Sequence, residues 1–202
     1  MGRQLGRHPE GECLAGETLI QVVRRAPLLM AALRAARDVD APDWLINAGA
    51  IRDVVFDALH DHPLTTPPRG VDLGFFDPDD LSPERDAEVE AALRERGPDL
   101  PWEAKNQAAV HLWYPQRFGF EVPPFRNTAE AVATFPLTAA CVGVRLLPDD
   151  ELLVVAPHGL DDLLGGVCRH NPTRVPRSFY DEWVGARRSA WRERWPRLRF
   201  IE

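Results

Sequence analysis

The most constraining feature of the sequence is a change of hydrophobic spacing at Gly49. Trp44 to Ala48 form a short, mainly apolar run that is typical of a strand. Beyond Gly49, apolar residues recur at helical spacing as far as Leu59. The segment therefore predicts a strand, a glycine turn and a helix, in that order.

The same spacing argument places other helices and strands on both sides of this unit. Helices are predicted from about residue 19 to a break near Pro27, then at 27–37, 82–96, 128–135 and 178–195. Strands are predicted at 71–76, 102–111, 139–147 and 152–156, the last two as a hairpin. This mixed order predicts an α/β (α+β) fold in which helices flank a mixed β-sheet. We expect one domain over 14–202 and disorder over 1–13.

The composition narrows the class of protein. Of the 202 residues, 45% are hydrophobic and 27% are charged, which is enough apolar material for one globular core. No apolar run approaches the length of a membrane span, and the N-terminus lacks the apolar segment of a secretion signal. Cys13, Cys141 and Cys168 lie far apart, which argues against a disulfide framework. We therefore expect a cytoplasmic protein with reduced thiols and no membrane contact.

The charge is negative overall but uneven along the chain. The net charge of −7 argues against a protein that coats nucleic acid nonspecifically. From Arg169 onward, however, nine arginines face four acids, and three tryptophans (Trp183, Trp191 and Trp195) fall in or just after the last predicted helix. Tryptophans at this spacing indicate core packing more often than RNA stacking. Nucleic-acid binding is therefore not expected, although the basic helix leaves it open.

Two segments carry residue types suited to phosphate and cation chemistry. A glycine turn at the start of a helix leaves backbone N–H groups free for a phosphate, and Arg52 adds a forked donor beside Gly49. A purely structural turn explains the same residues. In the next strand, position 72 alternates with the apolar residues Val71 and Leu73, so Asp72 is expected to face a cleft while they face the core.

Taken together, these segments resemble the polymerase-beta-like nucleotidyltransferases, including the members that add nucleotides to tRNA ends. The pattern is similar in particular to a bacterial nucleotidyltransferase-like family first described as a domain of unknown function. The matching stretches are Gly49-Ala-Ile-Arg-Asp-Val-Val, Val71-Asp-Leu-Gly-Phe-Phe-Asp, Trp102-Glu-Ala-Lys-Asn-Gln, Gly159-Leu-Asp-Asp-Leu and the closing Trp191–Leu198 block. They span roughly residues 40 to 200.

The resemblance implies a site for a nucleoside triphosphate and a divalent cation, Mg²⁺ or Mn²⁺. It assigns Asp72 and Glu103 as metal ligands and, with Lys105, as catalytic residues. It assigns nucleotide contacts to Gly49, Ala50, Arg52, Lys105 and Asn106. Lys105 is the only lysine among 24 basic residues and lies one strand period beyond Glu103, so we expect it on the same face.

One position departs from the family pattern. The first aspartate of the Asp-x-Asp pair falls on Gly70, which has no side chain to offer a cation. We therefore expect weak cation binding and a weak or inactive nucleotidyltransferase, with transfer of a nucleoside monophosphate to an acceptor that the sequence does not name. An acid from the 77–80 loop could compensate, but Asp77 has the opposite strand parity to Asp72. The alternatives are a non-catalytic nucleotide-binding or interaction protein and, less favoured, an RNA-end-modifying enzyme.

Overall fold

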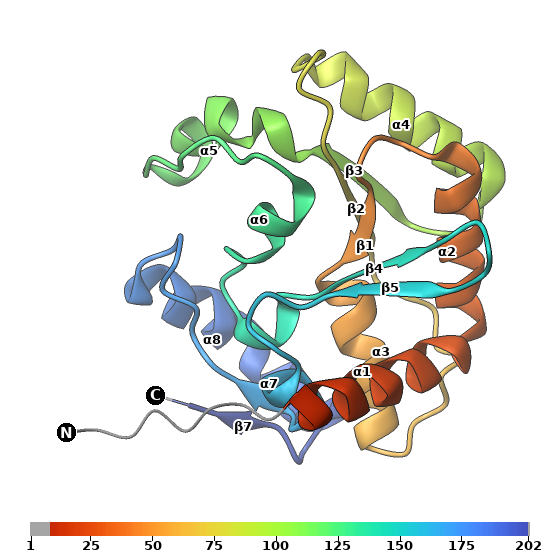
Figure 1. Cartoon of the computed structure of the whole chain (residues 1–202). Coiled ribbons are helices and arrows are strands. Elements are labelled where there is room, and N and C mark those ends of the chain that lie inside the picture. The colour runs from red at the N-terminus through yellow and green to blue at the C-terminus, as the bar shows by residue number, and fades with distance from the viewer. Residues whose placement is uncertain (1–8, 202) are drawn as a thin grey trace.

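A five-stranded mixed sheet lies at the centre of the computed structural model, which describes residues 9–201 (Figure 1). Across the sheet the order is β3 (Trp102–Asn106), β2 (Val71–Phe75), β1 (Leu45–Asn47), β4 (Gly143–Leu146) and β5 (Leu152–Val155). β2 and β3 are parallel, and the other neighbouring strands are antiparallel. The predicted mixed sheet is confirmed.

The helices that precede and connect these strands build the main core. They are α1 (Pro9–Arg24), α2 (Pro27–Val39), α3 (Gly49–Leu59) and α4 (Pro83–Arg96). Helices α2 and α4 lie on one side of the sheet (Figure 1). The register partners Ile46, Leu73 and Ala104 are all almost fully buried in this core. Since side chains alternate along a strand, their neighbours in sequence point to the other face.

The segment after β3 differs from the prediction. The strand expected at 102–111 ends at Asn106, whose side chain accepts a hydrogen bond from the backbone N–H of Ala108 and so starts a 3₁₀ turn over Gln107–Ala109. Helix α5 (Val110–Phe118) follows and ends at Gly119, which has a left-handed φ of 80°. With α6 (Thr128–Val132), it stands opposite the open face of the sheet (Figure 1). A small second core of Val110, Tyr114, Val122, Phe125 and Ala131 holds this region together.

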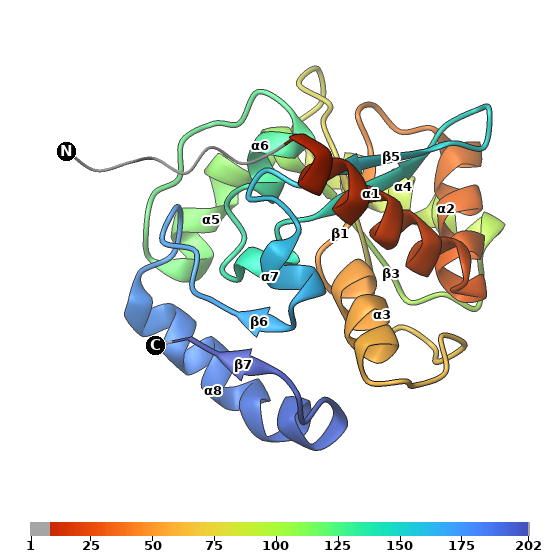
Figure 2. The ribbon, with the colours of Figure 1, turned by 60° about the horizontal axis from the view of Figure 1, so that its bottom comes forward.

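The C-terminal segment wraps back onto α3. It contains α7 (Asp161–Leu164), the parallel pair β6 (Val167–Cys168) and β7 (Arg199–Phe200), and α8 (Arg177–Arg194) (Figure 2). The 3₁₀ turn Thr138–Ala140, which precedes β4, contacts α3 and α7. The buried Asp57 of α3 accepts hydrogen bonds from Trp195 at 2.7 Å and from Arg194 at 2.8 and 3.0 Å. Trp191 and Trp195 are 2% and 1% exposed, so both pack in the core, as the helical spacing indicated.

Three further expectations concern the ends of elements. Ser82 precedes α4, but its side chain makes no capping hydrogen bond; the N–H of Arg85 donates instead to the backbone oxygen of Ser82 at 3.2 Å. Residues 1–8 lie outside the described part of the chain, and α1 begins at Pro9, within the range expected to be disordered. Among the described residues, none of the helices is both long and apolar enough to cross a membrane.

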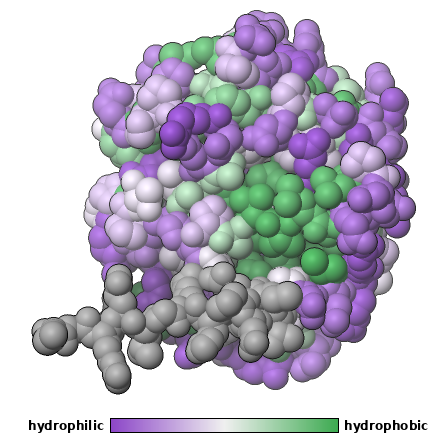
Figure 3. All heavy atoms as spheres, in the orientation of Figure 1, coloured by the Kyte–Doolittle hydropathy of each residue, from purple (hydrophilic) through white to green (hydrophobic). Residues whose placement is uncertain are grey.

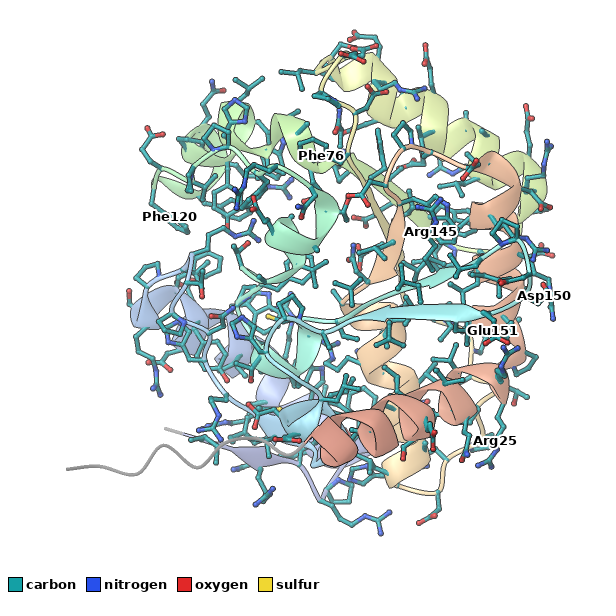
Figure 4. All side chains as sticks on the ribbon, in the orientation of Figure 1. Arg25, Phe76, Phe120, Arg145, Asp150 and Glu151 are labelled. Carbon is teal, nitrogen blue, oxygen red and sulfur yellow. The ribbon has the colours of Figure 1, made fainter. Side chains whose placement is uncertain are left out.

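The hairpin of β4 and β5 forms one edge of the sheet. Figure 3 shows that apolar surface gathers over this part of the molecule. Leu153 of β5 is 44% exposed. Arg145, Asp150 and Glu151 mark the polar end of the hairpin in Figure 4. There Asp150 accepts from Arg37 of α2 at 2.6 Å, which ties the hairpin to the helix layer.

Candidate functional site

Three polar side chains lie side by side on the open face of the sheet. Asn47 of β1 is the register partner of Asp72 of β2, and Asp72 is the register partner of Glu103 of β3. Directly opposite residues on neighbouring strands have Cβ atoms about 5 Å apart. The pleat therefore places two carboxylates and one amide in a row. Asp72 lies on the open face, as its alternation with Val71 and Leu73 predicted.

This row forms the floor of a cavity of about 240 Å³ between the sheet and the α5–α6 region. Lys105 and Gln107 extend the floor beyond Glu103. The opposite wall is mainly aromatic and comprises Val110, Trp113, Tyr114, Phe135 and Arg174. The cavity thus has an acidic floor and an aromatic wall that carries one guanidinium.

The electrostatics of the floor centre on Asp72. The pKa of Asp72 is raised from 3.8 to about 6, chiefly by burial and next by the charge of Glu103, with Asp53 adding to the rise and Arg52 opposing it. A carboxyl group with this pKa repels its neighbours when ionised and is poorly solvated. Both effects would be relieved by a cation in the cavity, so the two acids are set up for a positively charged ligand.

Helix α3 begins directly beside Asp72. A methyl group added at Gly49 would lie 3.8 Å from Oδ2 of Asp72 and 3.9 Å from Nη2 of Arg52. The residue before the helix, Ala48, has φ 50° and provides no side-chain cap. The first N–H groups of the helix are therefore not capped by a side chain. They lie at the positive end of the helix dipole, next to Asp72.

Arg52 is held in place by the C-terminal helix and by its own neighbour. Its guanidinium lies 4.5 Å from the ring centroid of Trp191 and donates two hydrogen bonds to Asp53, at 2.6 and 2.9 Å. Arg69 binds the other oxygen of Asp53 at 3.2 Å. Two arginines thus share one carboxylate next to the start of α3, which leaves positive charge there for an anion.

Lys105 lies where its strand parity predicted, on the face that carries Glu103. It lines the cavity, and its ammonium binds Asp86 of α4 at 3.1 Å. It also lines a second, more open cavity beside α4 and α5, together with Trp113 and Arg117. The structure therefore brings Asp72, Glu103 and Lys105 together, with Arg52 at the α3 end of the row.

Two residues expected to contact nucleotide lie elsewhere. Asn106 is 1% exposed and points away from the cavity; its amide donates to the backbone oxygens of Asp77 and Asp80 and its oxygen caps the following 3₁₀ turn. We therefore assign Asn106 a structural role, because the parity of β3 turns it from the face of Glu103. The side chain of Ala50, in the first turn of α3, is buried and cannot contact a nucleotide, so only its backbone N–H is left for that role; with Gly49 and Gly70, Ala50 lines a separate cavity of about 170 Å³.

Gly70 has room for a side chain. A methyl group added there would meet no heavy atom within 4 Å, and its φ lies outside the left-handed region. The acids of the following loop do not take its place, because Asp77 binds Arg85 at 2.8 Å and Asp80 caps the N–H of Ser82. Within residues 9–201, no group of three Asp, Glu, His or Cys side chains is arranged to hold a metal ion.

Sequence reasoning missed Asn47 on the floor of the cavity and most of its wall, including Tyr114 and Arg174. Asn47 could have been found, since it is the polar residue that ends an apolar strand next to the glycine turn. Tyr114 and Arg174 carry no such local pattern.

Comparison with known proteins finds a family and a similar solved structure. The chain matches the family model described as Nucleotidyltransferase over residues 34–200. Among solved structures it is similar to a protein whose NMR structure is described as revealing a CCA-adding enzyme head domain. That protein is 28% identical, the TM-score is 0.75, and the alignment covers 92% of this chain and 95% of the other. No curated protein matches the chain.

Proposed function

The chain belongs to the nucleotidyltransferase family, and on that premise we propose that it binds a nucleoside triphosphate with a divalent cation and transfers its nucleotidyl group weakly to an acceptor. One observation carries the proposal. Asp72 and Glu103 stand in register on the open face of the sheet, inside a cavity and next to the free start of α3.

The chemistry of the two acids fits Mg²⁺ or Mn²⁺. Both cations prefer oxygen ligands, and Mg²⁺ is typically held by one or two carboxylates together with phosphate oxygens and water. Burial and the charge of Glu103 raise the pKa of Asp72, and a cation beside the two acids would offset both effects. When bound, such a cation would orient the triphosphate and stabilise the charge that develops during phosphoryl transfer.

The chain's own residues divide the remaining work. The first N–H groups of α3, with Arg52, would bind the phosphates, because both present donors beside Asp72. Trp191 and Asp53 fix the plane of the Arg52 guanidinium and so its direction of donation. Lys105 would hold positive charge at the far end of the acid row, steadied by Asp86.

Gly70 explains why the proposed activity is weak. Two carboxylates offer fewer oxygens than the three acids of the family pattern, so a second cation has little to bind. The acceptor hydroxyl would then lack the second cation that activates it, while the nucleotide could still bind. A non-catalytic nucleotide-binding protein on the same fold is therefore the outcome nearest to the proposal.

Calorimetric titration of the native chain with each of the four triphosphates, with and without Mn²⁺, tests the proposal. We expect weak binding, tighter with Mn²⁺ by at least about threefold, since the cation links the acids to the phosphates. A parallel assay for pyrophosphate release separates slow transfer from binding alone. Absence of any Mn²⁺-dependent triphosphate binding would contradict the proposal.

A further inference from the structure

The guanidinium of Arg174 lies in the wall of the cavity and has no carboxylate partner among the described residues. Its Nε is buried and makes no hydrogen bond, and no carboxylate of the described residues forms an ion pair with it. The neighbouring Tyr114 lies 4.6 Å from it, measured to the ring centroid, and Phe135 lies 5.8 Å away. Arginines elsewhere in the fold, such as Arg52, Arg85 and Arg194, bind carboxylates at 2.6 to 2.8 Å.

Keeping a desolvated charge unpaired is costly for a folded protein. The aromatic contacts offset only part of this cost, because a cation–π contact is weaker than a charged hydrogen bond. The rings of Tyr114 and Phe135 supply no hydrogen-bond acceptor of the carboxylate or carbonyl kind. The N–H donors of Arg174 therefore remain for a ligand in the cavity.

The position of Arg174 distinguishes it from a phosphate-binding residue. The phosphate-binding groups of the proposed function lie at the start of α3, with Arg52 and Arg69 nearby. Arg174 instead belongs to the wall that holds Trp113, Tyr114 and Phe135. Aromatic walls stack nucleobases, and a forked guanidinium reads their acceptor edges.

We propose that Tyr114, Phe135 and Arg174 form the nucleobase subsite of the cavity and that Arg174 selects bases with two adjacent acceptors. This inference rests on the proposed function, because it requires the triphosphate to lie between α3 and the acid row. Guanine offers the adjacent acceptors N7 and O6, and cytosine offers N3 and O2. Adenine places its amino group beside N7 and N1, so it can satisfy only one arm of the fork.

The test compares the native chain with Arg174→Met, which removes the charge, and Arg174→Lys, which keeps the charge but loses the fork. Each is titrated in Mn²⁺ with GTP, CTP, ATP, UTP and inorganic tripolyphosphate. Arg25→Met serves as the matched control, since Arg25 is exposed between α1 and α2. It lies across the molecule from Phe120, whose ring centroid is 5.3 Å from that of Tyr114 in the cavity wall (Figure 4).

We expect the native chain to bind GTP or CTP at least about fivefold more tightly than ATP, the low end for one forked pair. Both Arg174 variants should reduce this preference to within about twofold and leave the affinity for tripolyphosphate unchanged. The Arg25→Met control should leave the affinity for every probe unchanged. Three outcomes overturn this inference but not the proposed function. They are a native chain without base preference, an unchanged preference in the Arg174 variants, and an equal loss of affinity for every probe, tripolyphosphate included. A native chain that binds no triphosphate overturns the proposed function as well.

Discussion

Replacing Asp72 by asparagine is expected to stabilise the folded chain by about 2 kcal/mol, within a range of roughly 1–3 kcal/mol, at pH 8. The reason is the raised pKa of Asp72, about 6 against 3.8 in the unfolded chain, which comes first from burial and then from Glu103. Between these two values the folded state holds its proton more tightly than the unfolded state does. Native stability therefore falls as the pH rises from about 4 to 6, and asparagine removes that loss.

Urea unfolding of both proteins at several pH values measures this effect. The advantage of Asp72→Asn should be full above pH 6 and vanish near pH 4. Asp99→Asn is the control, because Asp99 is exposed in the turn before β3 and its replacement should change stability by less than about 0.5 kcal/mol at every pH. An Asp72→Asn variant no more stable than the native chain at pH 8 would show that Asp72 is not strained by its surroundings.

Replacing Gly70 by aspartate is expected to raise the Mn²⁺-dependent affinity for a triphosphate by at least about tenfold, or roughly 1.4 kcal/mol. The new acid would share strand parity with Asp72 and add the missing oxygens on the α3 side of the site. The backbone accepts the change, because a Cβ at Gly70 meets no heavy atom within 4 Å.

Calorimetry of the variant and the native chain checks this gain. Gly185→Asp is a matched control: a Cβ at Gly185 is equally free of contacts, but Gly185 lies on α8, whereas Gly70 lies two residues before Asp72. The control should leave the affinity unchanged. Equal affinity of Gly70→Asp and the native chain would mean that the new carboxylate is captured by Arg69 or Arg52, and that Gly70 is not what limits cation binding.

The elements predicted correctly from sequence are those whose ends are marked by residues within or next to the element. Helix α4 was expected at 82–96 and is found at Pro83–Arg96, because Pro83 and Gly97 mark its ends in the chain itself. Helix α3 was predicted in the same way from the change of spacing at Gly49. Such signals depend on backbone preferences of a few neighbouring residues, which the sequence displays directly.

The elements that were missed depend on contacts between distant segments. Helix α5 contains Pro115, which argues against a helix in sequence, yet its first turns are fixed by Asn106 and by the second core. β6 and β7 are two residues each and are defined only by pairing with one another. A strand of two residues is too short to show a hydrophobic pattern in the sequence.

The same division holds for the site. Strand alternation put Asp72 on the open face and Lys105 on the face of Glu103, and the family resemblance assigned Asp72 and Glu103 to one site. Arg174 could not be placed, because its partners Tyr114 and Phe135 come from other segments that meet it only in the folded chain.

The central claim, that Asp72 is a cation ligand of a triphosphate site, is tested most directly by its own titration. The carboxyl ¹³C shift of Asp72 can be followed by NMR against pH in the free protein, with an α,β-methylene GTP analogue alone, and with the analogue plus Mg²⁺. The account predicts a midpoint near 6 in the free protein. The analogue alone should not lower it, because phosphates add negative charge, whereas the analogue with excess Mg²⁺ should lower it by at least about one pH unit. A midpoint that stays the same or rises when Mg²⁺ is added would contradict the claim.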